Sequence, residues 1–184
     1  MKKKLGILAA LIFFTAALFS GCGQSSKANT SWNDIKSKGE FVVGLDDSFP
    51  PMGFRDSKGH IVGFDIDMAK AAAKKMGVKV VFKPVEWDGI ILSLNNKDID
   101  VIWNGLTITE DRKKHISFSK VYLQNKQIIV VKNNSNIKTK KDLSGKTVGL
   151  QLGSSSETAL KSDAATSKSL KNVRKYSNNT EALL

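Results

Sequence analysis

The chain has 184 residues, of which 41% are hydrophobic and 25% are charged. These values are typical of a folded globular protein and exclude an intrinsically disordered chain. Its formal net charge of +12 comes mainly from scattered lysines, with no arginine-rich run and no basic stripe interleaved with aromatic residues, which argues against a nucleic-acid-binding protein.

Residues 1–21 are predicted to be a signal peptide. Three lysines, Lys2 to Lys4, precede an apolar run from Leu5 to Phe19. At about 1.5 Å per residue, this run is too short to cross a hydrocarbon core of about 30 Å comfortably. A short apolar run behind a positive cluster is typical of an export signal. The alternative is a short transmembrane anchor.

The apolar run ends in Phe19-Ser20-Gly21-Cys22, which resembles the lipobox of bacterial lipoproteins, with phenylalanine where that family prefers leucine. The resemblance implies that the signal is cut before Cys22 and that the thiol carries acyl chains such as palmitate. Residues 22–31 would then tether the domain to the membrane. Cys22 is the only cysteine, so an intramolecular disulfide is excluded.

From Ser31 onward, helical and strand patterns alternate. In chain order, the predicted elements are a helix over 32–38, a strand over 41–45, a loop over 46–55, a turn over 56–59, a strand over 61–62, a helix over 64–76, a strand over 78–82, a helix over 88–95 and a strand over 99–103. This alternation predicts an α/β fold with a parallel sheet. Ligands bind beyond the carboxyl ends of such strands, so the loops after Leu45, Phe82 and Trp103 are the expected binding region.

The helix over 64–76 is the clearest amphipathic segment of the chain. Its inward face is predicted to consist of Ile66, Ala69, Ala73 and Met76. Asp65 and Asp67 fall in the first turn, where acidic side chains favour the helix dipole, so both are interpreted as structural. Trp103 lies on a strand of buried character and is predicted to belong to the core.

A second α/β pattern begins after Asn133-Asn134-Ser135, which follow a β-branched run over 127–132. Its predicted elements are a helical turn over 140–144, a strand over 147–150, a helix over 154–161 and a strand over 172–176. A helix that begins at Thr180 stops in an apolar turn at Leu184. Since a domain seldom ends in such a turn, we expect this second part to be truncated.

Five segments in order resemble the polar amino-acid family of periplasmic-type solute-binding proteins, solute-binding protein family 3. They are 43–54, with its aromatic-proline loop, 63–69, 98–112, 117–122 and 143–155. The resemblance implies the type II periplasmic-binding-protein fold, in which two α/β lobes are joined by two crossing strands and hold the ligand between them. Lobe 1 would occupy 32–125, an incomplete lobe 2 would occupy 126–184, and the first crossing would lie near 124–129.

The same resemblance implies capture of a free polar amino acid and its delivery to the membrane subunits of an ABC permease. The protein would be a monomer, lipid-anchored on the extracytoplasmic face of the cell membrane, and not an enzyme. Two alternatives remain open. Some members of this fold are dehydratases of cyclic acids, which need a general acid or base in the cleft, and others are ligand-sensing ectodomains.

Arg112 is the first candidate for binding the carboxylate of an amino acid, because its planar guanidinium can make two parallel charge-assisted hydrogen bonds to one carboxylate. The alternative is that residues 110–114 are a solvated charge run. Thr109 is predicted to cap the short helix that carries Arg112. Thr107 and Gly105 offer a hydroxyl and an open backbone to the carboxylate and ammonium, although Gly105 is equally interpretable as a turn residue.

A second group of residues is expected to contact the side chain and ammonium of the ligand, or its carboxylate from lobe 2. Phe49 and Trp87 are candidates for an aromatic clamp, with a place in the core as the alternative for each. Asp46 could face an ammonium or a basic side chain, and Asn104, where relatives often carry serine, bears on selectivity. Ser155 would contact the carboxylate from lobe 2, cap a helix, or do both.

No cofactor and no metal is predicted. His60 and His115 are far apart in the sequence, and neither has metal-ligand spacing. The sequence contains no nucleophile elbow, no phosphate-loop lysine and no HExxH motif.

Overall fold

The computed structural model describes residues 30–184, so the predicted signal peptide and the predicted lipidation at Cys22 lie outside the described residues. The chain divides into two units, residues 1–34 and 35–184. Helix α2 (Thr30–Lys38) spans this boundary. No helix within the described residues is long and apolar enough to cross a membrane.

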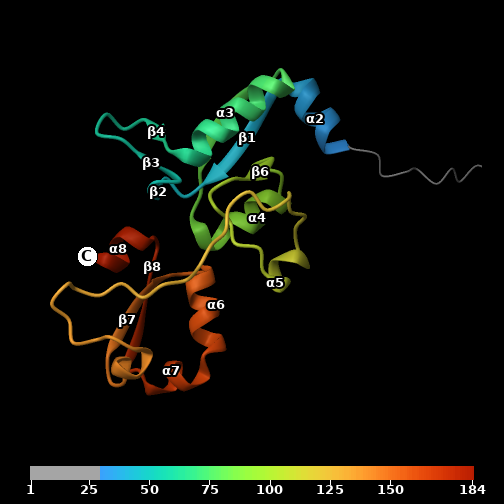
Figure 1. Ribbon diagram of the computed structural model, residues 1–184. Helices are drawn as coiled ribbons and strands as arrows, with labels where there is room; N and C mark the ends of the chain where they lie inside the picture. Colours follow the sequence, from blue (N-terminus) through green and yellow to red (C-terminus); the bar gives the residue numbers. More distant parts are fainter. Residues whose placement is uncertain (1–29) are drawn as a thin grey trace, which may run out of the picture. The chain divides into compact units, whose positions relative to one another are not determined.

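The first sheet is parallel, as predicted, with strand order β5-β1-β6. Figure 1 labels β1 and β6 of this sheet. Its central strand is β1 (Glu40–Leu45), flanked by β5 (Lys79–Pro84) and β6 (Val101–Ile102). Val43 and Leu45 of β1 are fully buried. Because both edges of β1 are paired and four of its six residues are buried, its near-continuous apolar sequence is the one expected for a central parallel strand.

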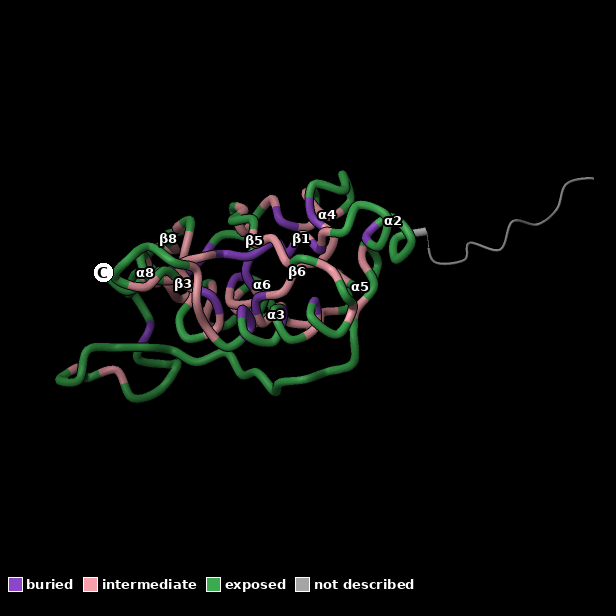
Figure 2. Tube along the Cα trace, turned by 90° about the horizontal axis from the view of Figure 1, so that it is seen from above, coloured by how far each residue is buried: buried purple, intermediate pink, exposed green. Residues whose placement is uncertain are grey.

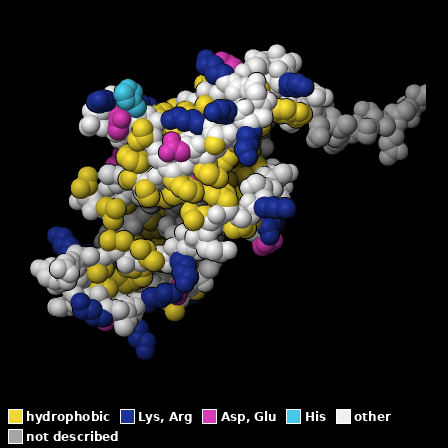
Figure 3. All heavy atoms as spheres, turned by 45° about the horizontal axis from the view of Figure 1, so that its top comes forward, with side chains coloured by type: hydrophobic (Ala, Val, Ile, Leu, Met, Phe, Trp, Pro, Cys, Tyr) yellow, Lys and Arg dark blue, Asp and Glu magenta, His cyan; other side chains and the backbone are white. Residues whose placement is uncertain are grey.

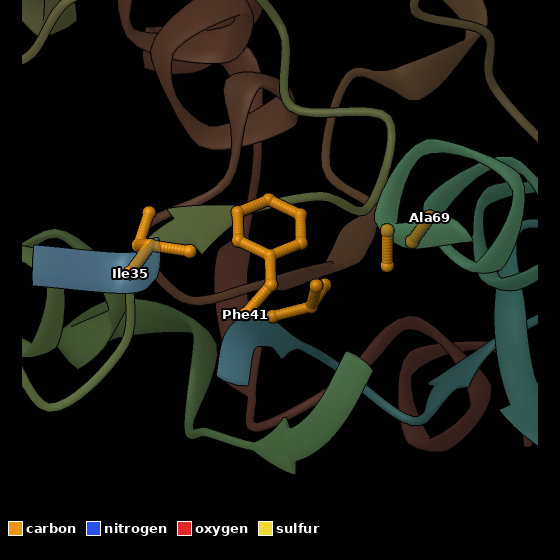
Figure 4. Close-up of a cluster of buried hydrophobic side chains, with 5 residues drawn as sticks. Ile35, Phe41 and Ala69 are labelled. Atoms are coloured by element: carbon orange, nitrogen blue, oxygen red, sulfur yellow. The ribbon is translucent and has the colours of Figure 1, made fainter. Parts of the chain in front are cut away.

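Helix α3 (Phe64–Met76) supplies much of the core beside this sheet. Its buried positions include Ile66, Ala69 and Ala73, as the amphipathic pattern predicts. Ala69 and Ala73 pack with Ile35, Phe41 and Val43 (Figure 4). Burial of each large apolar side chain contributes about 1.5–3 kcal/mol. Trp103 packs partly buried against this cluster, in agreement with its prediction as a core residue.

The loop predicted over 46–55 contains two short strands, so that prediction was wrong in part. β2 (Ser48–Phe49) and β3 (Gly53–Arg55) pair antiparallel, and β4 (Ile61–Val62) pairs with β3 in a second sheet. Strands of two or three residues are too short to produce a recognisable alternation of apolar and polar side chains. This small sheet places Phe49 next to the end of β1.

The rest of the first α/β region consists of short helices. The helix predicted over 88–95 is a 3₁₀ turn, η1 (Trp87–Gly89), followed by α4 (Ile90–Asn95). Helix α5 (Glu110–Lys113) follows the loop after β6. The backbone nitrogen of Arg112 donates to Thr109 Oγ1 at 3.2 Å, which confirms the predicted cap.

The second α/β region is built around β7 (Thr147–Gln151) and β8 (Asn172–Tyr176), which pair in parallel. Four helical segments accompany them: η2 (Lys140–Leu143), α6 (Ser155–Ser162), α7 (Ala164–Ser169) and α8 (Asn179–Leu183). Helix α7 was not predicted. The N-cap of α6 is Ser154, whose Oγ accepts from the Glu157 backbone nitrogen, so the alternative interpretation of Ser155 as the cap was wrong.

A segment without strands connects the two regions. Residues 119–134 are all exposed (Figure 2). The resemblance led us to expect a crossing strand near 124–129, but these residues pair with no strand in the described part of the chain. A strand exists only through hydrogen bonds to a neighbour, so the β-branched sequence alone is not sufficient to form one.

Candidate binding site

One cavity of about 820 Å³ brings together every residue predicted to contact a ligand. These residues are Asp46, Phe49, Trp87, Asn104, Gly105, Thr107, Arg112 and Ser155. Most of them follow the carboxyl ends of β1, β5 and β6, where a parallel sheet places its ligands. Ser155 comes from the first turn of α6. Hydrophobic side chains border a hollow on the face of the molecule that Figure 3 presents.

Arg112 is held by backbone carbonyls of both α/β regions. Its Nη1 donates to the Thr107 carbonyl at 2.9 Å, and its Nη2 donates to the Gly153 carbonyl at 3.1 Å. The guanidinium carbon lies 6.0 Å from the ring centroid of Trp87, a cation–π distance. Burial lowers the pKa of the Arg112 guanidinium, but an arginine stays charged in proteins. Arg112 is therefore a fixed positive charge at the cavity, and the interpretation of 110–114 as a wholly solvated charge run does not hold for it.

Asp46 presents a buried carboxylate. Its Oδ1 accepts from the backbone nitrogen of Ser48 at 2.9 Å and from the Ser48 hydroxyl, and its Oδ2 accepts from Gln151 Nε2 at 2.7 Å. Gln151 also donates to the Ser177 carbonyl at 3.0 Å and accepts from Asn179 Nδ2 at 3.0 Å. The orientation of the Asp46 carboxylate is therefore set by neutral donors, with no cation paired to it among the described residues.

Asn104 lines the cavity, and only the oxygen of its side-chain amide has a hydrogen-bond partner among the described residues. Its Oδ1 accepts from the Asp46 backbone nitrogen at 3.3 Å. Its Nδ2 is buried and has no hydrogen-bond partner among the described residues. Gly53 makes room for this amide, because a Cβ there would lie 2.8 Å from Asn104 Nδ2. This unpaired donor is enclosed by protein atoms near Gly53, and a buried donor without a partner costs free energy.

The Thr107 hydroxyl is a junction of side chains from three segments. Asn125 Nδ2 donates to Thr107 Oγ1 at 2.8 Å, and Ser155 Oγ donates to the same oxygen at 3.2 Å. Gln127 Nε2 donates to Ser155 Oγ at 3.0 Å. The two hydroxyls expected to meet a carboxylate are thus in contact with each other, and the connecting segment lies over them.

Gly105 does not present the open backbone nitrogen that we expected. Its N–H donates to Tyr122 Oη at 3.2 Å. Its φ of 60° belongs to the left-handed region, which glycine adopts without strain. A Cβ at this position would lie 3.8 Å from Phe49 Cε1, an ordinary contact distance, so the left-handed backbone rather than a lack of space favours glycine here.

The family model described as bacterial extracellular solute-binding proteins, family 3, matches residues 41–183. The chain belongs to this family. It is 39% identical over 156 residues to the L-cystine-binding protein TcyJ of Escherichia coli (strain K12), covering 83% of this chain and 59% of that protein. It is 38% identical over 157 residues to the arginine-binding extracellular protein ArtP of Bacillus subtilis (strain 168), covering 85% of this chain and 58% of that protein. The chain thus spans less than two thirds of the length of these relatives.

Solved structures confirm the type II periplasmic-binding-protein fold for this family 3 protein. The ancestral amino acid-binding protein AncCDT-1, a precursor of cyclohexadienyl dehydratase, superimposes with a TM-score of 0.78 at 40% identity, covering 84% of this chain and 68% of that chain. A substrate-binding protein of an ABC uptake transporter from Streptococcus pneumoniae, with bound histidine, superimposes with a TM-score of 0.78 at 37% identity, covering 86% and 65%.

Two groups at the site of this family 3 protein were missed in the sequence. Gln151 ends β7 just as Asp46 follows β1, so the carboxyl-end rule, applied to β7, would have found it. Glu157 is buried, and its carboxylate accepts from the Gly153 backbone nitrogen at 3.0 Å. The Nζ atoms of Lys161 and Lys175 form ion pairs with Glu157 Oε1 at 2.8 Å and 2.9 Å. The hydrogen bonds from both lysines lower the pKa of Glu157 to about 2. Its charge holds the loop whose carbonyl accepts from Arg112.

Among residues 30–184, no three His, Cys, Asp or Glu side chains gather as a metal site would require. The two histidines are exposed, and neither lines the cavity.

Proposed function

We propose that this family 3 protein binds a polar amino acid in the cavity and delivers it to an ABC importer. The observation that carries the proposal is the position of Arg112. Its guanidinium is half-buried at the cavity, stacked over Trp87 and anchored by two carbonyls, and arginine has more N–H donors than these two bonds use. The remaining donors are available to the α-carboxylate of a ligand, with the hydroxyls of Thr107 and Ser155 beside them.

Asp46 favours a ligand whose side chain carries a positive charge. The carboxylate is buried, lines the cavity and has no cationic partner among the described residues. A buried charge is stabilised by an opposite charge, and Phe49 and Trp87 offer aromatic faces to the same cation. Arginine, for which ArtP is named, belongs to this class of ligand, whereas cystine, for which TcyJ is named, carries a second ammonium together with a second carboxylate.

We assign the chain a binding role without covalent chemistry. Catalysis by this fold would need a general acid or base with a free proton position in the cavity. Of the carboxylates that line the cavity, Asp46 accepts hydrogen bonds through both oxygens and Asp163 pairs with Lys140. Arg112, which also lines the cavity, stays protonated. The relatives are named as binding proteins, and the dehydratase precursor is itself named an amino acid-binding protein.

Lipidation at Cys22 would place the binding unit on the extracytoplasmic face of the cell membrane. The last two residues of the predicted tether over 22–31 belong to α2, and the residues before α2 are mostly small and polar, a composition that suits a tether. Several acyl chains on one cysteine hold a protein at a bilayer more firmly than one chain. A monomer on such a tether can reach the permease subunits in the same membrane.

A thermal-shift screen of the full-length protein against the twenty amino acids and cystine tests the proposed function. A ligand present at about 100 times its dissociation constant stabilises the folded state by about 2.7 kcal/mol. We expect a rise in the melting temperature with arginine, histidine or another polar amino acid, and calorimetry to give one site per chain. If no amino acid raises the melting temperature while a cyclic organic acid is turned over, the dehydratase alternative replaces this proposal.

A further inference from the structure

The loop after β6 carries Asn104 and Thr107. Residues 104–109 of this loop form no strand, so no sheet pairing holds their backbone. Gly105 lies between these residues in a left-handed conformation, with a φ of 60°. A backbone of this kind keeps one shape only if its polar groups are tied to rigid elements. Arg112 Nη1 holds the Thr107 carbonyl, and the Gly105 nitrogen is held by a hydrogen bond to Tyr122 Oη at 3.2 Å.

Asp65 determines the direction of that hydrogen bond. Tyr122 Oη donates its single proton to Asp65 Oδ1 at 2.9 Å, which leaves the lone pairs of the phenol oxygen to accept from Gly105. Asp65 is fully buried in the first turn of α3, and its backbone nitrogen donates to the Met52 carbonyl at 2.9 Å. The acceptor is therefore fixed to the core of the first α/β region.

Besides the Tyr122 hydroxyl, the Gly105 backbone N–H and the Trp103 indole N–H face the Asp65 carboxyl group, and each of the three lowers its pKa. Its Oδ2 is buried without a hydrogen-bond partner among the described residues. Burial raises its pKa, and the hydrogen bond from Tyr122 opposes that rise. The phenol ring is also held by an edge-on contact with Trp103, with ring centroids 6.4 Å apart. Tyr122 therefore has one defined position, although its side chain is partly exposed.

We propose that Tyr122 and Asp65 are positioning residues for the amino-acid site: Asp65 orients the Tyr122 hydroxyl, whose oxygen fixes the Gly105 amide and so the loop that carries Asn104 and Thr107. Tyr122 also belongs to the segment that leads to the second α/β region, where Asn125 reaches the Thr107 hydroxyl. The same phenol thus ties this segment to the binding loop. The inference rests on the proposed function.

The test is Tyr122→Phe in the full-length protein, which removes one oxygen and keeps the ring against Trp103. We expect the dissociation constant for the amino acid to rise about tenfold, as for the loss of a hydrogen bond to a charged network. The Gly105 amide should exchange its hydrogen faster in the variant, as measured by nuclear magnetic resonance. Tyr176→Phe is the matched control, because Tyr176 is the other tyrosine of the chain and does not line the cavity.

A second variant, Asp65→Asn, keeps the size of the side chain and removes its charge. If Asp65 acts through Tyr122, the double variant should bind no more weakly than Tyr122→Phe alone, whereas independent effects would multiply. A lower melting temperature for Tyr122→Phe with an unchanged dissociation constant and unchanged Gly105 exchange would show a purely structural role and overturn the inference. Failure of the unmodified protein to bind any amino acid would instead contradict the proposed function.

Discussion

Gln151 Nε2 lies 2.7 Å from Asp46 Oδ2, so the last residue of β7 donates to the carboxylate that follows β1. Both residues are buried, with 3% and 9% of their surfaces exposed. Gln151 is itself held by the Ser177 carbonyl and the Asn179 amide. The contact therefore orients the Asp46 carboxylate, which is buried and lines the cavity together with the predicted aromatic clamp.

Replacement of Asp46 should change the selectivity of the site. Asp46→Asn keeps the size of the side chain and removes its charge, and hydrogen bonds to charged groups contribute about 1.5–3 kcal/mol. We expect the affinity for arginine to fall about 10- to 100-fold by calorimetry, with a much smaller effect on glutamine. Asp47→Asn is the matched control, since Asp47 pairs with Arg55 and does not line the cavity. Equal losses for both ligands would contradict a role in charge recognition.

Replacement of Arg112 should lower the affinity of the site for every amino-acid ligand. Arg112→Ala leaves the ligand carboxylate without its partner, which costs about 2–5 kcal/mol of binding free energy. Arg112→Lys keeps the charge but loses the planar fork, so we expect it to recover only part of the affinity. Arg174→Lys, at an exposed position in β8, serves as the control. Calorimetry that gives the same affinity for Arg112→Lys and the unmodified protein would argue against a two-bond contact.

Gly153→Ala should affect both stability and binding. Gly153 has a φ of +69°, and a Cβ there would lie 3.1 Å from Asp88 Cα, next to Trp87. Gly145 has nearly the same φ, +70°, but nothing within 4 Å of the added atom. Both variants should lose about 1–2 kcal/mol of stability because of the left-handed backbone. Only Gly153→Ala should also bind the ligand severalfold more weakly, because it displaces the carbonyl that accepts from Arg112.

The contribution of Glu157 to stability should depend on pH in the acid range. The pKa of Glu157 in the folded protein is about 2, below its ordinary value of 4.5, because Lys161 and Lys175 donate to its carboxylate. A group with a depressed pKa stabilises the folded state fully above the ordinary value, and the contribution is lost as the pH falls through the folded value. The unfolding free energies of Glu157→Gln and the unmodified protein should therefore differ at pH 5–7 and converge towards pH 2. A difference that stays constant from pH 7 to pH 2 would contradict this assignment.

Cys22→Ser should release the protein from the membrane. Serine carries no thiol for acylation, so fractionation of expressing cells should move the protein from the membrane pellet to the soluble extracytoplasmic fraction. Labelling with a palmitate analogue should mark the unmodified protein alone. If the variant stays in the pellet, the apolar segment from Leu5 to Phe19 is the anchor instead.

Much of the architecture could be predicted because strong local patterns carried it. The strands of the first sheet were predicted from mostly apolar runs of about five residues, and the helix over 64–76 from a helical periodicity. β2 and β3 were missed because pairs and triplets of residues have no periodicity. The crossing strand that the resemblance implied near 124–129 is not formed, since β-branched residues favour a strand without providing its partner.

The sequence alone determined the family, the order of the helices and strands, the parallel sheet, and the residue types that could bind an amino acid. These features depend on local composition and on motifs that follow one another along the chain. Only the tertiary structure decided which groups form hydrogen bonds with each other. Gln151 donates to Asp46, and Arg112 donates to the Thr107 and Gly153 carbonyls. The Gly105 amide donates to the Tyr122 hydroxyl oxygen. Each of these bonds joins residues far apart in the chain, or a side chain to a backbone whose shape the fold imposes. Local patterns specify what a residue can donate or accept, whereas packing specifies which group stands opposite.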